Sequence, residues 1–226
     1  LLSFLISTIL IVLLKLSFPV PRKFSDSFWI KKTHSNEKFD LVVCGDSRVY
    51  RSFSIDALQS KLNTPIRGVN LGYLSAGYSN EYLDFAISKF ESGSKQKILV
   101  LGISPHSLTQ EAFKNEHFKS FMDMGKNDVY KGLKLSSLYK FFAPYKPSEL
   151  FVNNKNVKTM YHSDGWVSTS WIKVDTLDGM KVYNRTFANY QVNKREVNIF
   201  LKKLDEIKAK GITIITYRPP STVQMR

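Results

Sequence analysis

Short apolar runs alternate with amphipathic stretches along most of the chain. Runs rich in β-branched residues at 39–44, 66–71, 98–101 and 212–217, bounded by glycine or proline, predict buried strands. Apolar residues at three-and-four spacing predict helices over 55–62, over 79–90 and between Asn193 and Gly211. The last helix starts with a capping box, Asn193 to Glu196, and Gly211 ends it. This alternation predicts an α/β fold with a parallel sheet covered on both faces.

The first 18 residues form an apolar stretch that carries a single charge, Lys15. Such a stretch predicts a transmembrane helix or uncleaved signal anchor whose start is missing, ended by Pro19 and Pro21. A cleaved signal peptide is the alternative, although no small-residue cleavage site follows. Residues 19–38 then read as a polar linker to one domain at 39–226.

The basic residues that follow this stretch bear on its orientation. Arg22, Lys23, Lys31 and Lys32 would hold that side in the cytoplasm by the positive-inside rule. The candidate chemistry instead favours a domain on the periplasmic or extracellular side, and we adopt that expectation.

The regular pattern decays between about residues 111 and 190. Short aromatic clusters alternate there with polar stretches over a length that an ordinary loop does not reach. We therefore expect an insertion with some helix of its own.

Composition narrows the class of protein. The chain has 226 residues, 43% of them hydrophobic, and a formal net charge of +14. This charge suits phospholipid headgroups or anionic glycans, although a lysine-rich solvated surface is the commoner explanation. The lysines are spread along the chain without a nucleic-acid-binding motif, so we expect no nucleic acid partner. The single cysteine, Cys44, cannot form an internal disulfide or a metal site alone, and we expect no metal and no cofactor.

The turn after the first predicted strand reads Gly45-Asp46-Ser47-Arg48. Glycine permits a sharp strand-to-helix turn, and Ser47 would lie at the start of the helix, where free N–H groups favour negative charge. A hydroxyl placed there could act as a nucleophile. The alternatives are an N-cap serine and a phosphate-binding turn.

The turns after the second and third strands carry further polar residues. Asn70, Gly72, Ser75 and Gly77 follow the second strand, where their backbone N–H groups could face a ligand; the alternative is a tight connection that needs glycine. After the third strand come Gly102, Ser104, Pro105 and His106. Ser104 could donate a hydrogen bond and His106 could titrate near neutrality; the alternative is a helix start with Ser104 as N-cap. In parallel sheets such turns meet at one edge.

Together the three turns resemble the blocks of the SGNH/GDSL hydrolase superfamily. Gly45-Asp46-Ser47 resembles the first block, with Arg48 where leucine is usual, and Asn70-Leu71-Gly72 resembles the second. The resemblance implies a flavodoxin-like three-layer fold with Ser47 as nucleophile. It also implies that Ser75 or Gly77 donates a backbone N–H to the oxyanion, with Asp46, Asn70, Gly72, Gly102, Ser104 and His106 around the site.

The third block departs from the usual Gly-x-Asn-Asp, since it reads Gly102-Ile103-Ser104-Pro105. This variant resembles the membrane-anchored branch whose members act in O-acylation of cell-surface polysaccharides, such as alginate acetylation. The resemblance implies an acyl-ester or glycan substrate and a membrane-bound acyltransferase as partner. Water as acceptor would make the protein an esterase, and a glycan hydroxyl would make it an O-acyltransferase.

The histidine of the superfamily's last block, Asp-x-x-His, has no counterpart in the chain. We therefore expect a sequence truncated at both ends, whose general base lies beyond Arg226, and a site mouth lined by His106. Trp166, beside His162 in the insertion, could stack on a sugar ring, although packing is the commoner role.

Two rival functions remain. One is a catalytically inactive relative that binds glycan or a membrane acyltransferase, and the other is a phosphate or nucleotide binder, which lacks the expected lysine motif.

Overall fold

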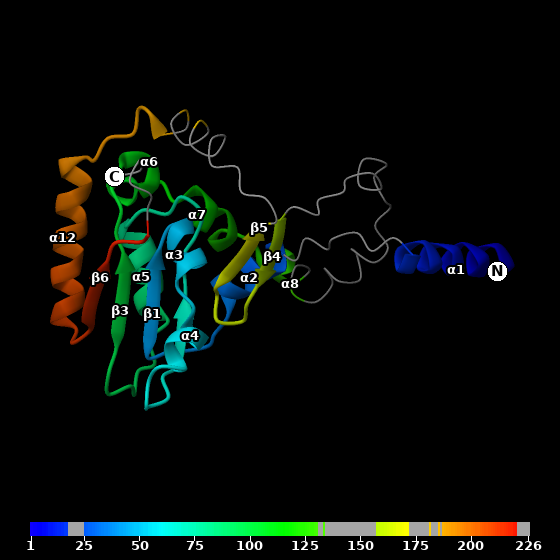
Figure 1. Ribbon diagram of the computed structural model, residues 1–226, viewed down its shortest axis with the longest axis horizontal. Coiled ribbons are helices and arrows are strands. Elements are labelled where there is room, and N and C mark those ends of the chain that lie inside the picture. The colour runs from blue at the N-terminus through cyan, green and yellow to red at the C-terminus, as the bar shows by residue number, and fades with distance from the viewer. Residues whose placement is uncertain are drawn as a thin grey trace.

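The computed structural model describes residues 1–17, 25–130, 133, 157–171, 181, 185 and 187–220. Its centre is a parallel sheet of β1 (Leu41–Gly45), β2 (Gly68–Asn70), β3 (Ile98–Gly102) and β6 (Thr213–Tyr217). The spatial order is β2-β1-β3-β6. Figure 1 labels β1, β3 and β6 side by side in this sheet. The predicted α/β fold with a parallel sheet is therefore confirmed.

Helices cover both faces of the sheet because alternate strand residues point to opposite sides. α3 (Ser47–Ser52) and α4 (Ile55–Gln59) pack on the face formed by Leu41, Val43 and Val100. α5 (Asn80–Ser88) and α12 (Lys194–Ala209) pack on the other face, where the larger core lies. Figure 1 shows α12 beside β6, at one end of the molecule.

The helices differ from the predicted ones mainly at their ends. α4 ends at Gln59 rather than at residue 62, because the chain turns at Ser60. Asn193 caps α12 as predicted, since its side chain accepts a hydrogen bond from the Arg195 N–H at 2.9 Å.

The predicted linker contains a packed helix, which is a correction to the sequence analysis. α2 (Ser25–His34) buries Trp29 and Ile30 in the core and contacts α7 (Glu116–Met122). The sequence did not reveal α2, because its few apolar residues give little helical periodicity. Tertiary packing around Trp29 stabilises it instead.

The apolar N-terminal stretch does form a helix, α1 (Leu2–Ser17), which lies apart from the α/β body in Figure 1. Leu2, Phe4 and Leu10 are among its exposed apolar side chains. Within the described residues, however, none of the helices has the length and apolarity needed to cross a membrane. The transmembrane part of the prediction is therefore unsupported.

Much of the predicted insertion lies outside the described residues, but its described parts are structured. The short helices η1 (His106–Leu108) and α6 (Gln110–Phe113) lead into it. Its described parts contain α7, α8 (Lys126–Tyr130), and a hairpin of β4 (Val157–Tyr161) and β5 (Val167–Trp171).

The turn of this hairpin docks onto the parallel sheet. The Asn70 N–H donates to the Asp164 carbonyl at 2.7 Å, and the Asp164 carboxylate accepts from the Ile55 N–H at 2.8 Å. The Trp166 indole N–H donates to the Arg51 carbonyl at 2.9 Å. The hairpin thus extends the body of the domain next to the end of β2.

Gly165 in this turn has no room for a side chain. Its φ is +87°, and a Cβ there would lie 2.1 Å from the Asn70 carbonyl oxygen. We expect Gly165→Ala to lower the free energy of unfolding by more than about 3 kcal/mol, measured by denaturant titration.

Gly211→Ala is the matched control. Gly211 also has a positive φ, +75°, but a Cβ there would meet nothing within 4 Å. It should cost only the backbone strain, about 1 kcal/mol. Equal losses in the two variants would contradict tight docking of the hairpin.

Candidate functional site

The strand ends that hold the candidate site approach α3 very closely. A Cβ on Gly45 would lie 2.3 Å from the Val49 Cγ2 atom, and one on Gly102 would lie 2.2 Å from the same atom. Gly45 also has a φ of +151°. Glycine at both positions therefore lets α3 start directly above the ends of β1 and β3.

Ser47 is the first residue of α3 and is half-buried. Its side chain makes no hydrogen bond to the residues that the structure describes. Asp46 precedes it as the N-cap, and its carboxylate accepts from the Arg48 N–H at 2.9 Å. The Ser47 hydroxyl is thus held on a well-defined turn without being tied to a neighbour.

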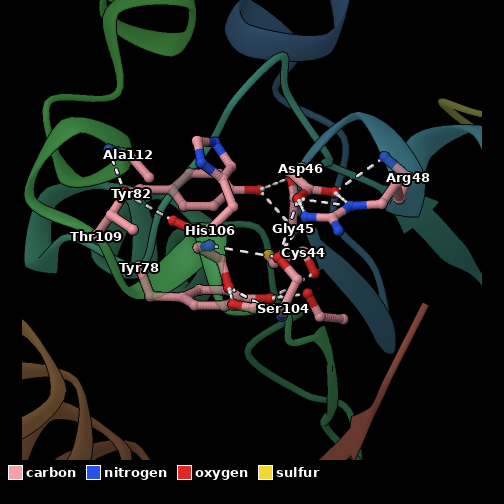
Figure 2. Close-up of polar contacts among 12 residues, drawn as sticks. Cys44, Gly45, Asp46, Arg48, Tyr78, Tyr82, Ser104, His106, Thr109 and Ala112 are labelled. Atoms are coloured by element: carbon pink, nitrogen blue, oxygen red, sulfur yellow. Dashed lines mark hydrogen bonds and ion pairs between the residues drawn. The ribbon is translucent and has the colours of Figure 1, made fainter. Parts of the chain in front are cut away.

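Asp46 and Arg48, which flank Ser47 in the chain, form one polar cluster with Ser104 (Figure 2). The Asp46 carboxylate, 2% exposed, is in a salt bridge with the guanidinium of Arg48. The Arg48 Nε lies 3.3 and 3.1 Å from the two carboxylate oxygens, and its Nη2 also donates to the Ser104 hydroxyl. The charge of the buried carboxylate is therefore compensated inside the site.

The Ser104 hydroxyl has little capacity left for a ligand. It donates to the Asp46 Oδ2 at 3.3 Å and accepts from the Ser107 N–H at 3.3 Å as well as from Arg48. Since a hydroxyl has one proton to donate, Ser104 holds the cluster together rather than presenting a free donor.

Asn70 is fully buried, and its side chain serves the fold. Its amide donates to the carbonyls of Val49 at 3.1 Å and Phe53 at 2.8 Å, and its Oδ1 accepts from the Gly72 N–H at 2.9 Å. Asn70 therefore ties the turn after β2 to the end of α3, and the Gly72 N–H is occupied.

The structure separates the two candidate oxyanion donors. The Gly77 N–H donates to the Ala112 carbonyl and to the Asn115 Oδ1, both at 3.0 Å. Ser75 is exposed and has a φ of +51°. Its N–H has no acceptor among the described residues. Ser75 is therefore the better placed of the two to face a ligand.

His106 lies at the same end of the sheet but is packed among aromatic rings. Its imidazole stacks on Tyr190 at 5.7 Å and contacts Phe187 at 4.8 Å, between ring centroids. Burial lowers the pKa of His106, partly offset by the Asp46 charge and the Ser75 backbone. The imidazole is therefore neutral at neutral pH.

Two tyrosines that the sequence analysis did not single out for the site brace the strand ends. The Tyr78 hydroxyl donates to the Gly102 carbonyl at 2.8 Å, and the Tyr82 hydroxyl donates to the Leu71 carbonyl at 2.8 Å and accepts from the Gly45 N–H at 3.1 Å. Both side chains are fully buried and reach the turns beside Asp46 and Ser104 (Figure 2). The sequence shows that Tyr78 and Tyr82 are four residues apart. Only the tertiary structure shows that both tyrosine hydroxyls reach the strand ends.

Two other residues considered from the sequence, Trp166 and Cys44, offer little free surface or reactivity to a ligand. Trp166 stacks on His162 at 4.2 Å between ring centroids, so one ring face is already covered. Cys44 is fully buried, and burial raises the pKa of its thiol to about 12. No group of three metal-ligating side chains occurs among the described residues.

Comparisons with protein-family models, with curated proteins and with solved structures find no match to this chain. The geometry of the candidate site is therefore the basis for inferring its function.

The buried salt bridge of the cluster predicts a measurable coupling. Arg48→Leu should cost about 3 kcal/mol or more of unfolding free energy, because it leaves the Asp46 carboxylate buried without its cation. The double variant Asp46→Asn with Arg48→Leu should lose less than the sum of the two single variants. Denaturant titrations of all four proteins check this, and additive losses would contradict the coupling.

Proposed function

We propose that this protein is a serine-dependent acyl-transfer enzyme, an ester hydrolase or O-acyltransferase, with Ser47 as nucleophile. The observation that carries the proposal is the position of Ser47. It is a half-buried serine with an unengaged hydroxyl, on a glycine-dependent turn at the carboxyl end of a central parallel strand. Ligand sites of open α/β sheets collect at this edge.

In the proposed reaction the Ser47 Oγ attacks the carbonyl carbon of an acyl ester and loses its proton to a base. The alcohol leaves as the tetrahedral intermediate collapses, and water or a second hydroxyl then takes the acyl group. Backbone N–H groups of Ser47 and Ser75 are the donors suited to the oxyanion, because those of Gly72 and Gly77 are occupied.

The reaction also needs a base that takes the proton of Ser47. Among the described residues, no imidazole is hydrogen-bonded to Ser47. His106 interacts electrostatically with Asp46 and Arg48 and is neutral, but its ring lies among Phe187 and Tyr190. We therefore assign His106 to the wall of the site, while the resemblance to the SGNH/GDSL superfamily implies that a histidine of the Asp-x-x-His type takes the proton of Ser47.

We infer the substrate from the resemblance of the third turn, and the location from the exposed side chains of α1 and the net charge. We propose acyl groups on exported or cell-surface glycans, and a domain on the extracytoplasmic side. The exposed apolar side chains of α1 support association with a membrane, and the net charge of +14 supports an anionic neighbourhood.

A catalytically inactive protein that binds glycan or partners a membrane acyltransferase is the second candidate. The cluster around Ser104 favours it, because Ser104 gives its proton to Asp46 and offers no side-chain donor to an oxyanion. The two functions differ in one property, the reactivity of Ser47.

A fluorophosphonate probe tests this property. We expect the folded full-length protein to be labelled on Ser47, located by peptide mass spectrometry, because the probe phosphonylates base-activated serines with loss of fluoride. Ser47→Ala should reduce labelling by about 1,000-fold or more. Ser120→Ala, which removes an exposed serine on α7, should label like the wild type.

The result that would overturn the proposal is a folded, full-length wild-type protein that remains unlabelled. That result would favour the inactive alternative. Labelling that persists in Ser47→Ala would show that another serine reacts.

A further inference from the structure

A second site lies away from Ser47, between α2, the edge strand β2 and the β4–β5 hairpin. It is a cavity of about 60 Å³, open to solvent on one side. Its polar lining includes three lysines from two elements, Lys31, Lys32 and Lys89, together with Ser35 and Ser163. Phe28, Phe39, Val69 and Leu71 form much of its apolar wall.

Lys32 places an ammonium group in the protein interior. Its side chain is 7% exposed and donates to the Gly72 carbonyl at 2.7 Å and to the Gly165 carbonyl at 3.1 Å. The rings of Trp29 and Phe28 lie 4.8 and 5.3 Å from the nitrogen. An ammonium has three N–H donors, so one remains after these two hydrogen bonds.

Lys89, which also lines the cavity, is held in a similar way. Its side chain is 6% exposed, and its ammonium donates to the carbonyls of Thr33 and Ser35 at the end of α2. Again one donor remains. Burial lowers the pKa of Lys89 to about 8, as expected for a cation removed from water.

Neither buried ammonium has a carboxylate partner in a salt bridge within the described residues. Asp164 acts on Lys32 only at longer range, since its oxygens accept from the N–H groups of Ile55 and Trp166. Glu37 lines the cavity and its charge acts on Lys89, but its side chain is exposed. Burial lowers the pKa of Lys32 well below its usual value. Two lysine side chains are therefore buried at one cavity without a salt bridge to a described carboxylate, and an anion bound between them would favour the charged form of both.

We propose that this cavity binds a small oxyanion, of the size of phosphate or of a short carboxylate. The anion would accept the remaining N–H donors of Lys32 and Lys89, and the hydroxyls of Ser35 and Ser163 supply further donors at the wall. Because Lys32 also holds Gly72, the bound anion would stiffen the turn that leads to Ser75. The inference is independent of the function proposed for Ser47.

Thermal unfolding with inorganic phosphate, and separately with acetate, tests the site at constant ionic strength. A ligand that binds only the folded protein raises the midpoint, and we expect a rise of about 3 °C at a concentration roughly ten times the dissociation constant. A response to phosphate alone would assign the ligand to the phosphate class, and a response to acetate would assign it to carboxylates.

Three variants separate the cavity from general attraction to a basic protein. Lys32→Met and Lys89→Met should each abolish the rise. Lys61→Met, which removes the same charge from an exposed residue outside the cavity, should keep it. Where Lys32→Met does not fold, Lys89→Met decides.

Two outcomes would overturn the proposal. An equal rise in the wild type and in all folded variants would mean that anions bind the surface only. A wild-type midpoint that neither anion changes would mean that the cavity holds water, which satisfies the N–H donors without balancing the charges.

Discussion

The close contact between Val49 and the two glycines at the ends of β1 and β3 determines much of this structure. It brings α3 down onto the sheet edge, so that the residues after β1 meet the residues after β3. Any side chain at Gly45 or Gly102 would push α3 away. The position of Ser47, and the meeting of Asp46 with Ser104, both depend on this contact.

The side chains of Asp46, Arg48, Ser104 and Asn70 around this contact are hydrogen-bonded, whereas the Ser47 hydroxyl is not engaged by the described residues. Asp46, Arg48 and Ser104 satisfy one another, Asn70 joins the turn after β2 to α3, and Tyr78 reaches the β3 end. Buried polar groups without partners are costly, so such a network tolerates few arrangements. This network suits a preorganised site, while the engagement of Ser104 limits which donors a substrate could use.

A buried polar side chain also joins α2, the β4–β5 hairpin and the turn after β2. Lys32 links them, because its ammonium bonds both to Gly72 near the candidate site and to Gly165 in the hairpin turn. A cation in this position holds three segments together, and its charge remains without a nearby carboxylate. The proposed oxyanion cavity follows from that imbalance rather than from the candidate active site.

The sequence alone predicted the parallel α/β architecture, since four short β-branched runs and the amphipathic helices between them carry their periodicity locally. It also indicated Gly45 to Ser47 as the turn of interest, because ligand sites in such sheets lie at the carboxyl ends of the strands.

The tertiary structure decided the rest. The helix at α2 forms through the burial of Trp29, which no local pattern reveals, and the transmembrane reading of the first residues gained no support. The partners of Arg48, Asn70, Tyr78 and Lys32 are dozens of residues away or depend on exact backbone placement, so only the folded chain could assign them.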